Sequence, residues 1–198
     1  MINKSFYTFE THIVHQIHNF NDEWYNNLSS QFMAKFESIK ADFGIDYIDA
    51  GDEEANIFEE KTPEQLDLKE VFQNAFRELS EAYGQSLNFS VDSLSRITLM
   101  KKNDYKPAHS HSDIDAFGIF YIDVGEKDTG GDLVLHDPRF HNQISFTGSK
   151  TQVITPTRGT LIAAPTYVWH EVSRYLGEST RLAVVCNCVV DYESKKRL

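Results

Sequence analysis

The chain has 198 residues, 40% of them hydrophobic, so it can bury one substantial core, and we expect a single domain over residues 1–198. Its 30 acidic side chains outnumber 19 basic ones, and the net charge of −11 disfavours nucleic acid and anionic membranes as partners. No apolar run has the length of a signal peptide or a membrane span, which predicts a cytoplasmic protein. A homo-oligomer is compatible with this composition.

Two amphipathic helices are predicted in the first half of the chain. Asn21 or Asp22 can cap the first helix, whose apolar residues recur at helical spacing, and Gly44 suits its C-terminal turn. The sequence Thr-Pro-Glu-Gln at residues 62–65 is a capping box with proline at the first helical position, and Gly84 follows the second apolar face. Residues 1–90 are therefore interpreted as mainly helical support.

Strands are predicted from residue 91 onward, where short runs rich in β-branched and aromatic residues alternate with glycine and proline. The expected strands are residues 95–100, 117–124, 132–135, 151–155, 160–164 and 181–190. Their spacing is typical of an antiparallel sandwich or small barrel, so residues 91–190 should form it, with the helices shielding one outer face. The fold class is thus α+β. Cys186 and Cys188 are expected to pack in the last strand rather than to form a bridge.

The histidines of the second half indicate a metal site. Three of the eight histidines fall within residues 12–18 and are explained by surface or helix-start positions, whereas the others are His109, His111, His136, His141 and His170. In an extended strand, His111 and Asp113 would project to the same face and could share one metal ion. Two histidines and a carboxylate form the facial triad of Fe(II) oxygenases, which keeps coordination positions open for O₂.

The motifs that follow this pair occur in a characteristic order. They are Gly130-Gly131-Asp132-Leu133, Pro156-Thr157-Arg158-Gly159, Trp169-His170-Glu171-Val172 and Arg181-Leu182-Ala183. Residues 95–190 thereby resemble the double-stranded β-helix (jelly-roll, cupin-like) core of the 2-oxoglutarate and Fe(II)-dependent oxygenase superfamily, in its prolyl-hydroxylase-like branch. They are most similar to a bacterial and phage subgroup with H-x-H, G-x-x-Y and D-P-R motifs, found here at residues 109–111, 118–121 and 137–139.

The resemblance implies Fe(II), O₂ and 2-oxoglutarate as co-substrate. By position, His111 and Asp113 would be the proximal metal ligands, His170 the distal ligand, and Arg181 the anchor for the far carboxylate of 2-oxoglutarate. A guanidinium suits this role because it binds a carboxylate through two parallel hydrogen bonds, and the apolar neighbours of Arg181 indicate an interior strand. The resemblance also aligns Tyr121 with a tyrosine that contacts the same carboxylate.

A second assignment of the metal ligands is possible. If His109 and His111 were the first two ligands, the site would be a three-histidine centre, and Asp113 would orient an imidazole. In the preferred register His109 faces the pocket as a substrate contact. Arg139, near the expected mouth, is a second candidate substrate contact.

The expected activity is hydroxylation of an aliphatic C–H bond in a peptide side chain or a small amino-acid-like substrate. One alternative is a cupin-type metal protein, which would use neither 2-oxoglutarate nor Arg181. Another is a catalytically silent β-sandwich that serves as a binding module. If Arg181 did not hold the co-substrate, Arg139 or Arg96 would be the next basic candidates.

Overall fold

The computed structural model describes residues 11–43, 57–91, 95–138 and 151–191. Two helices lie in the first half, α1 (Asp22–Phe43) and α2 (Pro63–Ala82), as predicted. Each begins at a capping side chain, since the Trp24 amide donates to Asn21 Oδ1 at 2.8 Å and the Gln65 amide donates to Thr62 Oγ1 at 3.3 Å. Neither helix is long and apolar enough to cross a membrane.

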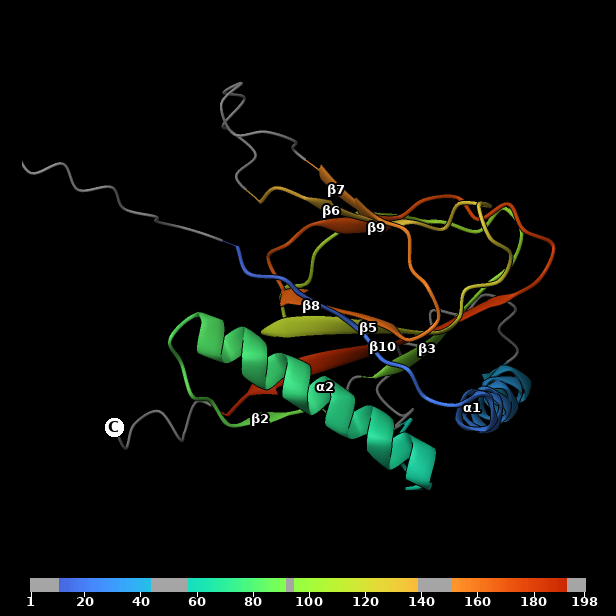
Figure 1. Cartoon of the computed structure of the whole chain (residues 1–198), viewed down its shortest axis with the longest axis horizontal. Helices are drawn as coiled ribbons and strands as arrows, with labels where there is room; N and C mark the ends of the chain where they lie inside the picture. Colours follow the sequence, from blue (N-terminus) through green and yellow to red (C-terminus); the bar gives the residue numbers. More distant parts are fainter. Residues whose placement is uncertain (1–10, 44–56, 92–94, 139–150, 192–198) are drawn as a thin grey trace, which may run out of the picture.

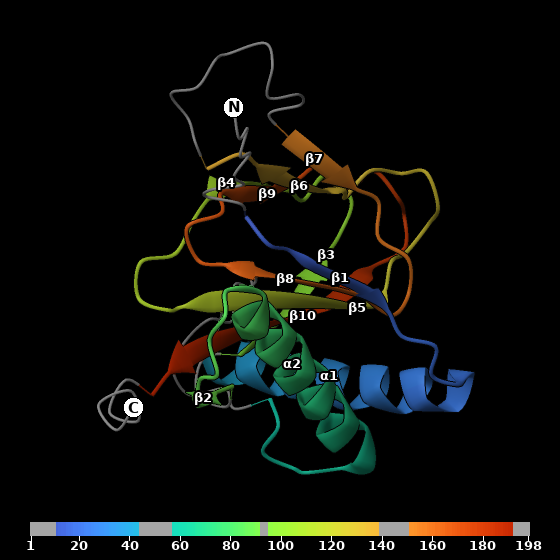
Figure 2. The ribbon, with the colours of Figure 1, turned by 60° about the vertical axis from the view of Figure 1, so that its left-hand side comes forward.

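The strands of the described residues form two antiparallel sheets that face each other (Figures 1 and 2). The larger sheet has the order β1-β8-β5-β10-β2, with β3 also paired to β10, and the smaller sheet has the order β4-β9-β6-β7. The strands are β1 (Val14–Ile17), β2 (Phe89–Ser90), β3 (Arg96–Met100), β4 (Lys106–His109), β5 (Ala116–Asp123), β6 (Leu133–His136), β7 (Thr151–Ile154), β8 (Thr160–Pro165), β9 (His170–Val172) and β10 (Arg181–Val190).

All six predicted strands are present within one residue of their expected ends. Of the histidines in residues 12–18, His15 lies in the edge strand β1, which pairs with β8, and not at a helix start; its side chain is exposed, in line with the surface interpretation. The extended strand expected at residues 111–113 is wrong. β4 ends at His109, and the chain must leave the smaller sheet before β5 begins in the larger one, so residues 112 and 113 form a bend.

Two apolar clusters lie on opposite faces of the larger sheet. The first fills the space between this sheet and the helices and includes Phe32 from α1, Phe72 from α2 and Phe120 from β5. The second lies between the two sheets. Because side chains alternate along a strand, Phe117 and Tyr121 of β5 belong to the second cluster, whereas Phe120 belongs to the first.

The two cysteines behave as predicted from the sequence. Cys186 and Cys188 are buried, unbridged and packed within the first cluster. Burial raises the pKa of the Cys188 thiol to about 12, so this side chain stays a neutral, packed group.

Candidate active site

Three histidines meet on the inner side of the smaller sheet. His109 ends β4 and lies directly opposite His170, the first residue of β9, while His111 follows two residues after the end of β4. Their candidate ligand nitrogens all lie within 4.8 Å of one another. One metal ion can bridge nitrogens at this spacing, since metal–imidazole bonds are about 2 Å long.

Local hydrogen bonds orient the rings of this cluster. The His170 Nδ1 lies 3.0 Å from the Val168 carbonyl, and the His109 Nδ1 lies 2.8 Å from the Pro107 carbonyl. A proton on each Nδ1 that is donated to its carbonyl leaves each Nε2 as the unprotonated nitrogen that a metal requires.

Burial also keeps the distal histidine neutral. His170 is 4% exposed, and Phe117 stacks on its ring at a centroid distance of 4.1 Å. Burial, reinforced by the neighbouring His109 and His111, lowers the pKa of His170 to about 3. The imidazole is therefore in the form that ligates a metal over the whole physiological pH range.

Asp113 lies outside the histidine cluster, and its side chain is exposed. The backbone of His111 is held instead by Thr166, whose hydroxyl donates to the His111 carbonyl at 2.6 Å. Within the described residues, the structure thus brings together His109, His111 and His170 but not Asp113. A ligand role for Asp113 stays a prediction.

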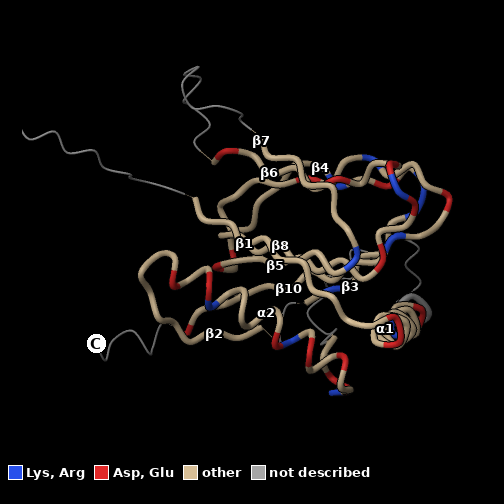
Figure 3. Tube along the Cα trace, viewed as in Figure 1, with Lys and Arg blue, Asp and Glu red and all other residues tan. Residues whose placement is uncertain are grey.

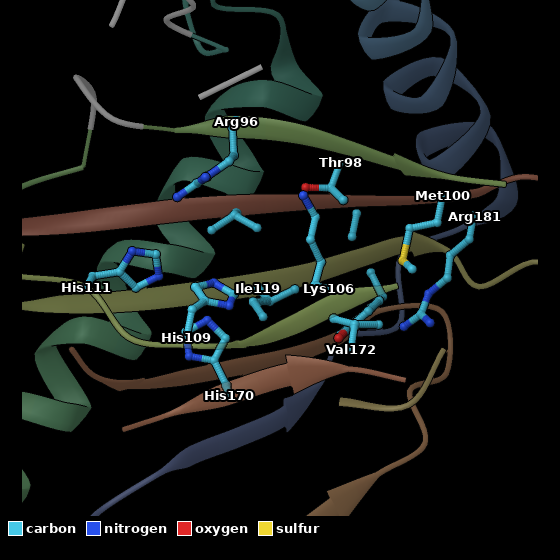
Figure 4. A pocket seen from close by; sticks show the side chains of 13 residues that line it. Arg96, Thr98, Met100, Lys106, His109, His111, Ile119, His170, Val172 and Arg181 are labelled. Atoms are coloured by element: carbon cyan, nitrogen blue, oxygen red, sulfur yellow. The ribbon is translucent and has the colours of Figure 1, made fainter. Parts of the chain in front are cut away.

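A pocket of about 620 Å³, its open mouth included, extends from the histidines between the two sheets (Figure 4). Arg181 lies at the opposite end from the histidines and is 2% exposed. Its Nη1 donates to the Gly131 carbonyl, and its guanidinium carbon lies 4.8 Å from the centre of the Tyr121 ring. Arg181 and Tyr121 are thus brought together in this pocket, as their predicted roles require.

Two polar atoms at this end of the pocket are buried without a hydrogen-bond partner of ordinary geometry among the described residues. They are Arg181 Nη2 and Tyr121 Oη. Burial raises the pKa of Tyr121 to about 12, so its hydroxyl remains a proton donor. Buried donors without partners are costly, and two that lie together in a cavity fit a carboxylate.

The remaining predicted residues lie elsewhere. Arg139 and His141 are outside the described residues. His136 lines a separate groove together with His15, and its Nε2 lies 3.7 Å from a Glu171 carboxylate oxygen. The sequence interpretation missed Lys106 as a pocket residue, and it considered Arg96 only as a substitute for Arg181. The signal for Lys106 was weak, because β4 is short and contains a proline.

Comparisons with known proteins identify a matching family model and structures of similar fold. The family model described as "Putative 2OG-Fe(II) oxygenase" matches residues 95–187. No curated protein sequence matches the chain significantly. A prolyl hydroxylase from Trichoplax adhaerens, solved with a hypoxia inducible factor peptide fragment, has 12% identity and a TM-score of 0.61, covering 94% of this chain and 87% of that one.

Two further structures are similar. HygX from Streptomyces hygroscopicus, solved with nickel and 2-oxoglutarate, has 10% identity and a TM-score of 0.58, covering 90% of this chain and 82% of that one. An oxidoreductase of the 2OG-Fe(II) oxygenase family from Burkholderia pseudomallei has 17% identity and a TM-score of 0.48, covering 65% of this chain. This chain spans only 57% of the length of that protein.

The likeness to the prolyl hydroxylase and to HygX concerns the fold. Their double-stranded β-helix is the architecture described above, with two helices on the outer face of one sheet, so the predicted fold class is confirmed. The family match covers the segment that carries the histidine cluster, Tyr121 and Arg181. Residues 95–187 thus match the family model of 2OG-Fe(II) oxygenases, and this segment of the chain is similar to that family.

Proposed function

We propose that the chain is an Fe(II)- and 2-oxoglutarate-dependent dioxygenase that hydroxylates an aliphatic C–H bond of a peptide side chain or a small amino-acid-like substrate. The observation that carries this proposal is the arrangement of one pocket. Its three histidine nitrogens at one end suit a metal ion, and the two buried donors of Arg181 and Tyr121 at the other end suit a carboxylate.

The metal ligands in this proposal are His109, His111 and His170. They offer neutral imidazole nitrogens that are already close together, and Fe(II) accepts such ligands. The alternative register, with Asp113 in place of His109, would require an exposed carboxylate in a bend to turn toward the cluster. Asp113 in our assignment remains at the surface.

The co-substrate would lie between the histidines and Arg181. The Arg181 guanidinium and the Tyr121 hydroxyl would bind its far carboxylate, with Arg181 held in place by the Gly131 carbonyl. Ile119 and Val172 contribute apolar walls that limit the access of water to the reacting centre. Bound iron, with O₂ and 2-oxoglutarate, would supply the oxidising chemistry, and the protein would supply position and a dry pocket.

The two alternatives each leave one feature of the pocket unexplained. A cupin-type metal protein would bind metal at the histidines, but it would not need the buried donors of Arg181 and Tyr121. A silent binding module would not need three ligand nitrogens within 4.8 Å of one another. The hypoxia inducible factor peptide bound to the Trichoplax prolyl hydroxylase supports a peptide side chain as one substrate class.

An anaerobic titration with Fe(II) and then 2-oxoglutarate tests the proposal. We expect a weak visible charge-transfer band that requires both components and disappears in Arg181→Gln. His136→Ala is the control, because His136 lies on the same sheet as His109 and His170 but lines a separate groove. Metal binding without a response to 2-oxoglutarate would indicate the cupin-type protein, and binding of neither would indicate the silent module.

A further inference from the structure

His111 is held differently from the other two histidines of the cluster. His109 and His170 face each other on the paired strands β4 and β9, so the register of the smaller sheet fixes them. His111 lies in the connection between β4 and β5, which leaves the smaller sheet and enters the larger one. Its ring centroid lies 5.2 Å from that of His109 and 5.3 Å from that of His170 (Figure 4). Contacts outside the smaller sheet must therefore set the position of His111.

Thr166 supplies contacts of this kind. It is the first residue after β8, and its hydroxyl donates a hydrogen bond to the His111 carbonyl at 2.6 Å. The His111 amide donates to the Thr166 carbonyl at 3.4 Å, and the Thr166 amide donates to the Asp115 carbonyl at 3.1 Å. The hydroxyl bond is the shortest of these three, and it is the one that comes from a side chain. Thr166 thus binds the connection both at His111 and at Asp115.

The end of this connection is anchored to the larger sheet. The Asp115 amide donates to the Cys188 carbonyl at 2.9 Å, and the Asp115 carboxylate accepts from the Val190 amide at 2.8 Å. Both acceptor and donor belong to β10, which pairs with β5. Thr166 therefore ties His111 to a part of the fold that paired strands hold in place.

The turn that begins with Thr166 also reaches a second histidine of the cluster. The Val168 carbonyl lies 3.0 Å from His170 Nδ1. Residues 166–168 thus contact the backbone of His111 and the ring of His170. A metal ion needs each imidazole nitrogen at about 2 Å, so a small shift of either histidine weakens the site. The turn after β8 is placed to fix these two histidines relative to each other.

We propose that Thr166 is a positioning residue, which holds His111 at the separation from His170 that a bound metal ion requires. The inference rests on the proposed function, because it takes His111 as a metal ligand, and it goes beyond that function by assigning a role to the turn after β8. The Thr166 hydroxyl is directed to the His111 carbonyl, so its effect passes through the backbone of that histidine rather than through contact with the metal.

Co(II) is the probe for the test, because it binds imidazole nitrogens and its visible absorption depends on the number and arrangement of its ligands. A titration of the full chain measures the affinity, and the spectrum at saturation reports the ligand geometry. Figure 3 shows acidic residues spread over both helices and the loops, and such residues can bind Co(II) weakly. His111→Ala is the blank for this weak binding, since it keeps the acidic surface and removes one ligand.

Thr166→Val removes the hydroxyl but keeps the branched shape of the side chain. We expect it to bind Co(II) on the order of tenfold more weakly and with an altered spectrum, because a group that orients a ligand is lost. Thr166→Ser keeps the hydroxyl and should restore most of the affinity and the wild-type spectrum. Thr129→Val is the matched control and should bind Co(II) normally. The Thr129 hydroxyl also donates to a backbone carbonyl, that of Glu126 at 2.7 Å, but in the connection from β5 to β6.

Thermal unfolding without metal separates this role from a purely structural one. A folded Thr166→Val protein with the Co(II) affinity and spectrum of the wild type would overturn the proposal, even if its melting temperature fell. If Thr166→Val did not fold, Thr166→Ala would be measured against the same two criteria. A wild-type protein that binds Co(II) no better than His111→Ala would instead refute His111 as a ligand, and with it the metal site of the proposed function.

Discussion

His109 and His170 lie directly opposite each other on the antiparallel strands β4 and β9, and their ring centroids are 4.3 Å apart. The pairing register of β4 and β9 thus fixes the relative position of two residues that are far apart in the sequence. His111 joins them from the chain just beyond β4, with its ring 5.2 Å from that of His109. The geometry therefore favours the three-histidine register.

The first prediction compares His109→Ala with Asp113→Ala. The His109 variant should lose Fe(II) binding, because a ligand is removed, whereas the Asp113 variant should keep it, because that carboxylate is exposed and outside the cluster. Iron content after anaerobic loading measures the difference. If iron binding were lost in the Asp113 variant and kept in the His109 variant, the carboxylate register would be correct.

The second prediction concerns Arg181→Ala. Its affinity for 2-oxoglutarate should fall about tenfold to a hundredfold, since hydrogen bonds to charged groups contribute about 1.5 to 3 kcal/mol. Fe(II) binding should persist, because Arg181 lies at the far end of the pocket from the histidines. Arg181→Lys should restore only part of the affinity, as an ammonium lacks the planar fork. Unchanged affinity in Arg181→Ala would shift the role to another basic residue, with Arg96 the first to test.

The third prediction concerns Tyr121→Phe, which removes one buried hydroxyl and little volume. The variant should bind 2-oxoglutarate roughly fivefold more weakly, in line with a net hydrogen-bond contribution of about 1 kcal/mol. Its thermal stability without ligand should be equal or higher, because Tyr121 Oη has no hydrogen-bond partner of ordinary geometry among the described residues. Equal affinity of both proteins would mean that Tyr121 is a packing residue only.

The fourth prediction follows from the raised pKa of Tyr121, which burial moves from 10.0 to about 12. Between these values the unfolded chain releases the phenolic proton and the folded protein retains it, so the stability of the folded state should fall as pH rises. Below pH 10 both states keep the proton and this contribution is constant. Chemical unfolding at pH 9 and pH 11 should show a smaller loss of stability in Tyr121→Phe than in the wild type, and equal losses would contradict the assignment.

The fifth prediction compares two glycines: Gly118, which lies in β5 of the larger sheet, and Gly131, which lies in the connection from β5 to β6. A Cβ at Gly131 would collide with Arg181 Nη1, and the φ of +74° is strained for any other residue. A Cβ at Gly118 would lie 2.9 Å from the Phe72 ring of α2, on the helix side of the sheet. Both alanine variants should lose stability in chemical unfolding, but only Gly131→Ala should also lose 2-oxoglutarate affinity. Normal affinity in a folded Gly131→Ala protein would show that Arg181 does not depend on this carbonyl.

The sequence predicts long elements well, because their patterns are strong. Helix α2 has a capping threonine, a proline and a regular apolar face, and eight of the ten residues of β10 are apolar, so both were predicted closely. The placement of Arg181 in the interior followed from the apolar residues after it. Strands β1, β2, β4 and β9 were missed; each has four residues or fewer and carries polar side chains, so its local pattern is weak.

The missed strands explain the uncertainty about the ligands. The sequence shows three candidates in residues 109–113, but it does not show that β4 ends at His109 or that residue 170 pairs with it. That information comes from the path of the chain between the two sheets. A short strand containing Lys106 and Pro107 is not distinguishable from a turn by local pattern, so Lys106 was not recognised as a pocket residue.

Strand β10 offers a practical route to altering the pocket. Ala183 and Val185 line the pocket, whereas Leu182 and Val184 point to the helices on the other side of the same sheet. A laboratory selection for a new substrate range can therefore randomise the first pair while the second pair preserves the scaffold. Mutational tolerance along this strand should alternate from one residue to the next.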